Sequence, residues 1–313
     1  MTHISLNGHS KASMTEPRKV YDLAGLTAIT TGSSRYSNSS LPKVNMFTFS
    51  RGIGSGIALE LARRGSNVVV NYTSSKSQKA ADEVVNIIAN AGSGARAVST
   101  QADVTTTEGQ NKLVEAALAL SENNTINILV HNAGNGDDCY LPDITEDFYE
   151  MQTKTNVKGR CHFPHTITGQ SVDSNSHAAP IFLTQKVIPY MPRGGRIILI
   201  SSCSARMGVA QQTVYAATKA SNESFARVWA TELGQSKGIT VNCVNPGPVA
   251  TDGYYSSTQD FLDDLKPLID STPAEARVGE VRDIAPIVGF LASEESRWVT
   301  GSTISACGGL LFF

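Results

Sequence analysis

The sequence predicts a single α/β domain in which helices cover both faces of one doubly wound parallel sheet. Short runs rich in Val, Ile and Leu alternate along the chain with longer segments of helical period. These runs are continuously apolar, which is typical of strands buried on both faces of a parallel sheet. Strands that alternate with helices in this way pack as three layers, with the sheet in the middle.

In chain order, the predicted strands cover residues 26–30, 67–72, 95–100, 126–130, 196–200 and 239–244. Segments long enough to be crossover helices lie between them, at residues 57–64, 77–91, 107–120 and 213–234. Ligands of such sheets bind beyond the carboxyl ends of the strands. The residues that directly follow each apolar run are therefore candidates for chemistry.

Charge and hydropathy exclude several classes of protein. The chain has 313 residues, with 26 Lys and Arg against 28 Asp and Glu, and no basic cluster, which argues against nucleic-acid or membrane-surface binding. With 41% apolar residues it can bury a core, yet no apolar run reaches the roughly 18 residues of a membrane span. We expect residues 1–20, which are polar, to form a flexible tail rather than a secretory signal, and residues 21–313 to form the domain.

The cysteines indicate a reducing compartment. Five of them are scattered along the chain without a C-x-x-C pair: Cys139, Cys161, Cys203, Cys243 and Cys307. An odd number without paired spacing does not fit a disulfide framework. We therefore expect a cytoplasmic protein.

Two segments, residues 35–50 and 160–179, interrupt the α/β rhythm. The first has no acidic residue and no strand or helix period, and the second holds three of the six histidines. They could be insertions that loop outward, parts of a metal site, or introns translated in frame. The metal interpretation is weak because Cys161 and His162 are adjacent and do not easily ligate one ion; its other candidates are His165 and His177. We therefore expect no bound metal.

Retained introns explain both segments best. The amino acids at each border are compatible with intron donor and acceptor codons, and removal in frame would give TGSSRGIGSG at the first junction and NVKAPIFLTQ at the second. A cDNA product spanning both junctions tests this hypothesis, and a full-length transcript in active cells contradicts it.

A glycine-rich turn follows the first predicted strand. It begins at Thr31 and Gly32 and continues, after the first segment, with Arg51, Gly52, Ile53 and Gly54. Such a turn lets the backbone approach a pyrophosphate and directs a helix N-terminus at its charge. The pattern predicts a dinucleotide site, although sixteen extra residues within the turn are expected to distort its backbone.

The residues after the second strand favour NADPH over NADH. An NAD site usually places a carboxylate there, to bind the ribose 2′-hydroxyl. Here the strand ends in Asn71, Tyr72, Thr73 and Ser74, without an acid. Arg51 and the hydroxyls can receive a 2′-phosphate, because a guanidinium matches phosphate oxygens. The alternative is that Arg51 is a solvated loop charge.

Candidate catalytic residues stand in one helical stretch. Tyr215 and Lys219 are four residues apart, so their side chains emerge on one face, and Ser202 ends the preceding strand. Tyr and Lys at this spacing also occur by chance in many helices. Their significance depends on the motifs around them.

Those motifs resemble the short-chain dehydrogenase/reductase family. They are the interrupted glycine turn, Asp103 and Val104 after the third strand, HNAG at 131–134, Asn156 in the helix that follows, Ser202, YAATK at 215–219 and NPGPVAT at 245–251. The resemblance covers roughly residues 23–309 and implies a Rossmann fold. Within the family, the chain looks most similar to fungal-type polyketide ketoreductases such as hydroxynaphthalene reductases, and next to 3-oxoacyl carrier-protein reductases.

The resemblance implies four catalytic residues. Tyr215 would protonate the carbonyl oxygen as general acid, and Lys219 would lower the pKa of Tyr215 and bind the nicotinamide ribose. Ser202 would polarise and position the carbonyl, and Asn156 would hold a water that links Lys219 to solvent.

The same resemblance implies the cofactor contacts. Asn132 and Gly134 would border the adenosine side, Asp103 would accept from the adenine amino group, and Thr251 would meet the carboxamide. His131 departs from the family, which usually has Asn there. The candidate NADPH-binding set is Gly32, Arg51, Gly52, Ile53, Gly54, Asn71, Asp103, Val104, Asn132, Gly134, Tyr215, Lys219, Pro246, Gly247 and Thr251.

The substrate region is expected at residues 252–276. It carries Tyr254, Tyr255, Phe261 and Leu265 among polar residues, which indicates either a mobile lid with an apolar inner face or a helix packed on the core. Its charges are mainly acidic, whereas recognition of an acyl carrier favours a basic entrance. This favours a free hydrophobic or aromatic ketone.

We therefore predict an NADPH-dependent oxidoreductase that reduces such a ketone, reversibly, to a secondary alcohol. One alternative is a 3-oxoacyl carrier-protein reductase, and another is a catalytically impaired nucleotide-fold protein, because the glycine turn is split. The family suggests a homodimer or homotetramer, with the helix at 213–234 and its Phe225 and Trp229 as the interface. Ordinary core packing explains those two aromatic residues equally well.

Overall fold

The computed structural model describes residues 21–33, 52–157 and 179–312. The predicted tail, Arg51, residues 35–50, and the second segment with Cys161 and its neighbouring histidines, except for Ala179, lie outside the described residues. The predictions made for them therefore stay predictions.

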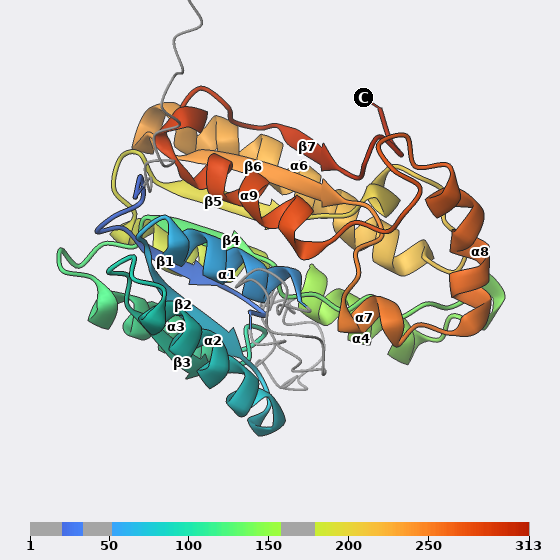
Figure 1. Cartoon of the computed structure of the whole chain (residues 1–313), viewed down its shortest axis with the longest axis horizontal. Coiled ribbons are helices and arrows are strands. Elements are labelled where there is room, and N and C mark those ends of the chain that lie inside the picture. Colours follow the sequence, from blue (N-terminus) through green and yellow to red (C-terminus); the bar gives the residue numbers. More distant parts are fainter. Residues whose placement is uncertain (1–20, 34–51, 158–178, 313) are drawn as a thin grey trace, which may run out of the picture.

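The centre of the molecule is one seven-stranded, entirely parallel sheet (Figure 1), with strand order β3-β2-β1-β4-β5-β6-β7. The predicted doubly wound fold is confirmed, and the strand order reverses between β1 and β4, where such sheets bind ligands. The strands are β1 (Thr27–Thr30), β2 (Asn67–Tyr72), β3 (Ala97–Gln101), β4 (Ile128–His131), β5 (Arg196–Ile200), β6 (Thr240–Pro246) and β7 (Thr303–Ala306).

Five of the six predicted strands are buried as their apolar runs indicate, whereas the sixth, β3, lies at the edge of the sheet and has no buried residue. Every residue of β1, β2, β4, β5 and β6 is buried, as predicted for strands covered on both faces. The edge strand β7 is only half-buried and was not predicted. Its four residues, TISA, are short and partly polar, so no apolar run marks them.

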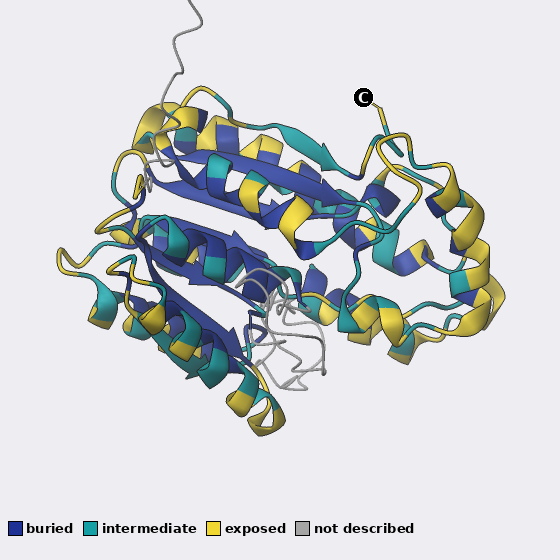
Figure 2. Ribbon diagram, in the orientation of Figure 1, coloured by how far each residue is buried: buried dark blue, intermediate teal, exposed yellow. Residues whose placement is uncertain are grey.

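Helices cover both faces of the sheet and complete three layers (Figure 2). One face carries α1 (Ile53–Arg63), α2 (Gln78–Asn90) and α9 (Val281–Ala292), whose side chains share a core cluster with β1, β2 and β4. The other face carries α3 (Thr107–Leu120), α5 (Ala179–Val187) and α6 (Thr213–Lys237), with a second cluster. Within the described residues, no helix has the length and hydropathy to cross a membrane.

The remaining elements gather at the carboxyl end of the sheet. They are α4 (Glu146–Asn156), α7 (Asp252–Tyr255) and α8 (Gln259–Asp270), which lie together at one end of the molecule in Figure 1. Short 3₁₀ turns connect other elements: η1 (Ser75–Ser77), η2 (Leu141–Asp143), η3 (Ile188–Tyr190), η4 (Cys203–Ala205) and η5 (Glu294–Ser296).

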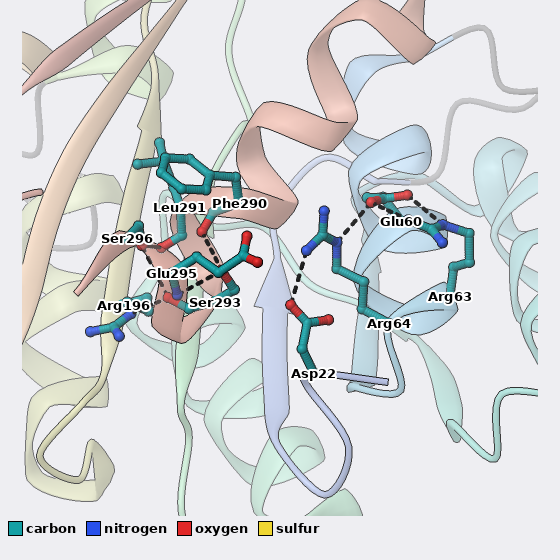
Figure 3. Close-up of polar contacts among 10 residues, drawn as sticks. All are labelled: Asp22, Glu60, Arg63, Arg64, Arg196, Phe290, Leu291, Ser293, Glu295 and Ser296. Atoms are coloured by element: carbon teal, nitrogen blue, oxygen red, sulfur yellow. Dashed lines mark hydrogen bonds and ion pairs between the residues drawn. The ribbon is translucent and has the colours of Figure 1, made fainter. Parts of the chain in front are cut away.

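An ion-pair network ties α1 to the start of the domain (Figure 3). Glu60, only 5% exposed, accepts hydrogen bonds from Arg63 at 2.7 and 2.8 Å and from Arg64 at 2.8 Å. Arg64 also donates to Asp22 at 3.0 Å. In α9, Gly289 provides space for this network, since a Cβ there would lie 2.6 Å from Arg64 Nε.

Candidate active site

The two described parts of the glycine turn meet in space, although 22 positions separate Gly32 from Gly54. A Cβ on Gly54 would lie 2.5 Å from the Gly32 carbonyl oxygen and would also overlap the Asn132 amide. Gly32 itself has φ +61° and packs against Ala133. Contrary to the expected distortion, the described flanks of the turn retain the close backbone approach that a phosphate-binding turn needs.

Two asparagine side chains hold this turn in place. Asn71 Oδ1 accepts from the Gly32 N–H at 2.9 Å, and Asn71 Nδ2 donates to the Ala102 carbonyl at 2.9 Å. Asn132 Nδ2 donates to the carbonyls of Thr31 and Gly32 at 3.0 and 3.1 Å. The amides therefore fix the ends of β1, β2 and β4 relative to one another.

A cavity of about 500 Å³ opens beside the turn. Its walls include Tyr72, Thr73, Ser74 and Ser77 at the end of β2, where a carboxylate would mark an NAD site. Of the predicted cofactor set, the cavity is lined by Gly32, Gly52, Ile53, Gly54, Asp103, Val104, Asn132, Gly134 and Thr251.

Asn71 requires a correction. The predicted cofactor set includes Asn71, but this residue is 1% exposed and does not line this cavity. Its side chain is used within the protein, on Gly32 and Ala102. The sequence could not show this, because the partners lie 39 and 31 positions away in the chain.

A second cavity, of about 610 Å³, adjoins the first. The two cavities share part of their lining, including Ile53, Asn132, Gly134 and Thr251. Together the cavities form an elongated cleft. The second cavity is also lined by Ser202, Tyr215, Lys219, Pro246 and Gly247. The structure thus brings the described candidate cofactor residues other than Asn71, and three candidate catalytic residues, to one cleft.

Lys219 is fixed behind Tyr215. Its Nζ donates to the Ile200 carbonyl at 2.9 Å, and its own carbonyl accepts from the Ser201 hydroxyl at 2.7 Å. These bonds join α6 to the end of β5. The neighbouring residue, Ser202, caps η4 by accepting from Ser204 N at 3.2 Å.

Burial changes the pKa of both residues of the Tyr-Lys pair. It raises the pKa of Tyr215 to about 12, against the opposing effect of a hydrogen bond with Ser202. It lowers the pKa of Lys219 to about 8. Burial disfavours the charged form of each group. Burial has the largest effect on the pKa of Tyr215, and the lowering by Lys219 that the resemblance implies stays a prediction.

Asn156 lies at the end of α4 and is 3% exposed. Its Oδ1 accepts from Asn135 N at 2.8 Å, while Nδ2 donates to the Asn135 carbonyl at 2.7 Å and to Thr218 Oγ1 at 3.0 Å. The side chain thus connects the loop after β4 to α6. A small cavity lined by Asn156, Lys219 and Asn222 lies behind it.

The far wall of the larger cavity is apolar. Phe261 and Leu265 of α8 are 6% and 7% exposed and cluster with Val209, Tyr254 and Leu268. All five also line the cavity, so the predicted apolar inner face exists. Tyr255, in contrast, is 62% exposed.

His131, which departs from the family pattern, is buried at the end of β4. Its Nε2 lies 2.8 Å from Thr184 Oγ1, and its ring meets Trp229 edge-on at 6.5 Å. Burial lowers its pKa to about 3. A neutral imidazole at this position joins β4 to α5 and α6.

Sequence reasoning did not identify several residues of the loop after β4. Asp138 lines the larger cavity and accepts from Gln212 Nε2 at 3.1 Å, and a Cβ on Gly136 would lie 3.1 Å from the Tyr215 ring. The only sequence signal was their position directly after a strand.

Comparison with known proteins identifies the family. The family described as Enoyl-(Acyl carrier protein) reductase matches residues 48–311. The short-chain dehydrogenase/reductase FrzI of Cladobotryum sp. is 40% identical over 267 residues, which cover 84% of this chain and 93% of FrzI. The chain belongs to the short-chain dehydrogenase/reductase family.

Other members of the short-chain dehydrogenase/reductase family that match this chain have more specific names. A probable tetrahydroxynaphthalene reductase of Zymoseptoria tritici is 34% identical, with 85% of this chain and 93% of that protein covered. The structure of the angucycline C-6 ketoreductase LanV with bound NADP has a TM-score of 0.74 and 30% identity, covering 93% of this chain and 97% of LanV. The predicted family is confirmed, and the predicted enzyme class, an NADP-dependent short-chain reductase acting on CH–OH groups, agrees with these relatives.

Proposed function

We propose that this protein reduces the ketone of a hydrophobic or aromatic metabolite to a secondary alcohol, with NADPH as cofactor. The observation that carries the proposal is the cleft that runs from Gly32 and Gly54 to Ser202, Tyr215 and Lys219. At one end of this cleft, the backbones of Gly32 and Gly54 approach each other closely, as binding of a pyrophosphate requires. At the other end lie Tyr215, the proposed general acid, and its neighbours Ser202 and Lys219.

The residues fit the cofactor at both ends. Close-packed glycines leave room for a dinucleotide over the turn, and the hydroxyls of Thr73, Ser74 and Ser77 stand where a 2′-phosphate would be received. The adenine end would be held by Asp103, and the nicotinamide end by Thr251 and Gly247. When bound, NADPH supplies the hydride.

The protein's own residues then handle the proton and the carbonyl. In this proposal Tyr215, neutral because burial raises its pKa, donates its hydroxyl proton to the carbonyl oxygen. Ser202 donates a hydrogen bond to the same oxygen and orients it. Lys219, charged below pH about 8, stabilises the tyrosinate that forms, and Asn156 keeps the loop after β4 against α6.

Three observations support a free ketone as the substrate. The substrate wall is apolar at Phe261, Leu265 and Leu268, and the relatives named above are a hydroxynaphthalene-type reductase and an angucycline ketoreductase. Among the described residues that line the larger cavity, Lys219 is the only Lys or Arg. A 3-oxoacyl carrier-protein reductase, the alternative that the sequence resemblance left open, needs a basic surface near its entrance to receive an acidic carrier.

We propose further that the protein is a cytoplasmic homodimer or homotetramer. Phe225 and Trp229 stack on each other at 5.2 Å and pack against the core, so they are poor candidates for the interface. Met151 of α4 and Val228 of α6 are 43% and 49% exposed and fit a helical interface better. Light scattering coupled to size-exclusion chromatography measures the assembly.

An NADPH fluorescence titration, with NADH as comparison, tests the proposed cofactor. We expect saturable NADPH binding that is tighter than NADH binding, followed by oxidation of NADPH when an aromatic ketone is added. If the full chain binds neither cofactor but a version without residues 35–50 and 160–179 does, the segments are not part of the working enzyme. If neither version binds, the proposed function is wrong.

A further inference from the structure

Two carboxylates that line the larger cavity, Asp137 and Asp138, have no role in the chemistry described above, and Asp138 is the less exposed of the two. Asp138 lies in the loop between β4 and η2, and it lines the same cavity as Ser202 and Tyr215. Its negative charge contributes, after burial, to the raised pKa of Tyr215. Asp138 follows Gly136 by two positions, and a Cβ on Gly136 would lie 3.1 Å from the Tyr215 ring, so this part of the loop lies beside the position where the substrate carbonyl has to lie.

The loop holds Asp138 in a fixed position. Gln212 Nε2 donates to Asp138 Oδ1 at 3.1 Å, and the next residue, Cys139, donates its N–H to the Gln211 carbonyl at 2.9 Å. Gln212 precedes the first residue of α6, three positions before Tyr215. The carboxylate is thus tied to the helix that carries the proposed acid.

Asp138 also lacks a cationic partner in the described part of the chain. No ion pair reaches it there, and the one Lys or Arg among the described cavity residues, Lys219, is bonded to the Ile200 carbonyl. Gln212 is 9% exposed, and its Oε1 has no hydrogen-bond partner among the described residues. An ionised carboxylate accepts hydrogen bonds at about four lone-pair sites, and one donor from Gln212 leaves most of them to water.

A substrate that enters the cavity displaces that water. A carboxylate that loses water without gaining a donor is destabilised, whereas a donor from the substrate restores the hydrogen bond in a poorly solvated site. An anionic group near the substrate carbonyl meets like charge and is disfavoured.

We propose that Asp138 is a specificity-determining residue that selects ketones carrying a hydrogen-bond donor, a hydroxyl or an ammonium group, near the carbonyl. The inference rests on the proposed ketone reduction and narrows its substrate class. It distinguishes a hydroxylated or amine-bearing ring system from a plain hydrocarbon ketone of the same size.

The test compares kcat/KM for 1-tetralone and for its hydroxyl-substituted and aminomethyl-substituted derivatives. We expect the wild-type protein to prefer the best donor-bearing ketone over 1-tetralone by at least about tenfold, as one charge-assisted hydrogen bond predicts. Asp138→Asn should reduce that preference to less than about threefold, mainly by raising KM for the donor-bearing ketones. A larger loss for the aminomethyl ketone than for the hydroxyl ketone identifies an ammonium as the preferred donor.

The neighbouring carboxylate provides the matched control. Asp137 lines the same cavity, but it is exposed, and its carboxylate accepts from Asn135 Nδ2 at 3.2 Å. We expect Asp137→Asn to keep the wild-type preference. NADPH titration of both variants shows that each is folded.

Three outcomes contradict the proposal. If Asp138→Asn keeps the wild-type preference for donor-bearing ketones, the substrate does not bind this carboxylate. If Asp138→Asn and Asp137→Asn lose that preference equally, the effect is one of charge in general. Both leave ketone reduction itself intact. If wild-type protein that binds NADPH reduces none of the three ketones, the proposed function fails as well.

Discussion

Lys219 Nζ lies 5.6 Å from the centroid of the Tyr215 ring. Four positions along α6 bring the ammonium behind the phenol, where the bond from Nζ to the Ile200 carbonyl holds it. Burial nevertheless dominates both groups, because it raises the pKa of Tyr215 to about 12 and lowers that of Lys219 to about 8. A protonated Lys219 therefore lowers the free energy of unfolding, because burial disfavours its positive charge in the folded protein.

The first prediction concerns stability at alkaline pH. Between about pH 8 and 10, the unfolded chain keeps its Lys219 proton, because the ordinary pKa is 10.5, while the folded protein loses it. Stability rises with pH wherever the unfolded state binds more protons. We therefore expect the free energy of unfolding of the wild-type protein to rise, relative to that of Lys219→Met, by on the order of 1–2 kcal/mol over this range. The conversion is about 1.4 kcal/mol per pKa unit.

Urea unfolding at pH 7, 8, 9 and 10, without cofactor, measures this difference. The comparison is restricted to pH 10 and below because the raised pKa of Tyr215 acts in the opposite direction above that value. A free-energy difference between the two proteins that stays constant with pH would show that Lys219 keeps an ordinary pKa.

The second prediction removes the proposed acid. Tyr215→Phe deletes one hydroxyl and leaves the ring that packs beside Gly136. We expect turnover to fall at least about 100-fold, the usual contribution of general acid catalysis, with NADPH affinity changed little. Initial rates and fluorescence titration measure the two quantities.

A tyrosine remote from the cleft provides its control. Tyr21 donates to the Gly92 carbonyl at 3.2 Å, and Tyr21→Phe is expected to keep wild-type turnover. Unchanged turnover in Tyr215→Phe would exclude Tyr215 as the acid.

The sequence predicted those parts of the molecule that have a local signal. The continuous runs in β2 and β5 marked buried strands, and the spacing of Tyr215 and Lys219 placed both on one helix face. By contrast, α9 was missed. It contains Pro286 and Gly289, which usually argue against a helix, and the structure uses Gly289 to make room for Arg64.

Contacts between segments far apart in the chain could not be predicted from the sequence. Asp138 and Gln212 are 74 positions apart, and Asn71 reaches Gly32 across 39 positions. Neither pair belongs to one helix or strand, so no periodicity joins them. Consequently the sequence indicates neither the bond of Asn71 to the turn nor the position of Asp138 beside α6.

The third prediction concerns the glycine turn. Gly54→Ala places a methyl group against the Gly32 carbonyl and the Asn132 amide, both of which are fixed by other hydrogen bonds. Because the turn has to move to admit it, we expect NADPH affinity to fall at least about tenfold, equal to about 1.4 kcal/mol. Fluorescence titration measures the affinity.

Gly234→Ala is the matched control for this variant. Gly234 lies in α6 with nothing within 4 Å of its would-be Cβ. Alanine there should leave NADPH binding unchanged and stabilise the protein by roughly 0.5–1 kcal/mol. Equal NADPH affinities in Gly54→Ala and wild type would mean that the turn does not carry the cofactor.

The last prediction concerns the ion-pair network of α1 (Figure 3). Burial of Glu60 alone would raise its pKa, but the hydrogen bonds and charges of Arg63 and Arg64 outweigh this and hold the pKa below 4.5. A carboxyl with a lowered pKa stabilises the folded state at neutral pH, and this contribution is lost as pH falls through the folded-state pKa. We expect Glu60→Gln to lower the free energy of unfolding at pH 7 by about 1–3 kcal/mol.

Glu108→Gln is the control, because the ion pair of Glu108 with Lys112 is exposed and such pairs contribute little. Urea unfolding at pH 7 and at pH 3 to 4 measures all three proteins. The deficit of Glu60→Gln should shrink at the acidic end, where wild-type Glu60 takes up its own proton and loses the same ion pairs. A deficit of equal size at both pH values would mean that Glu60 acts through its shape and packing rather than through its charge.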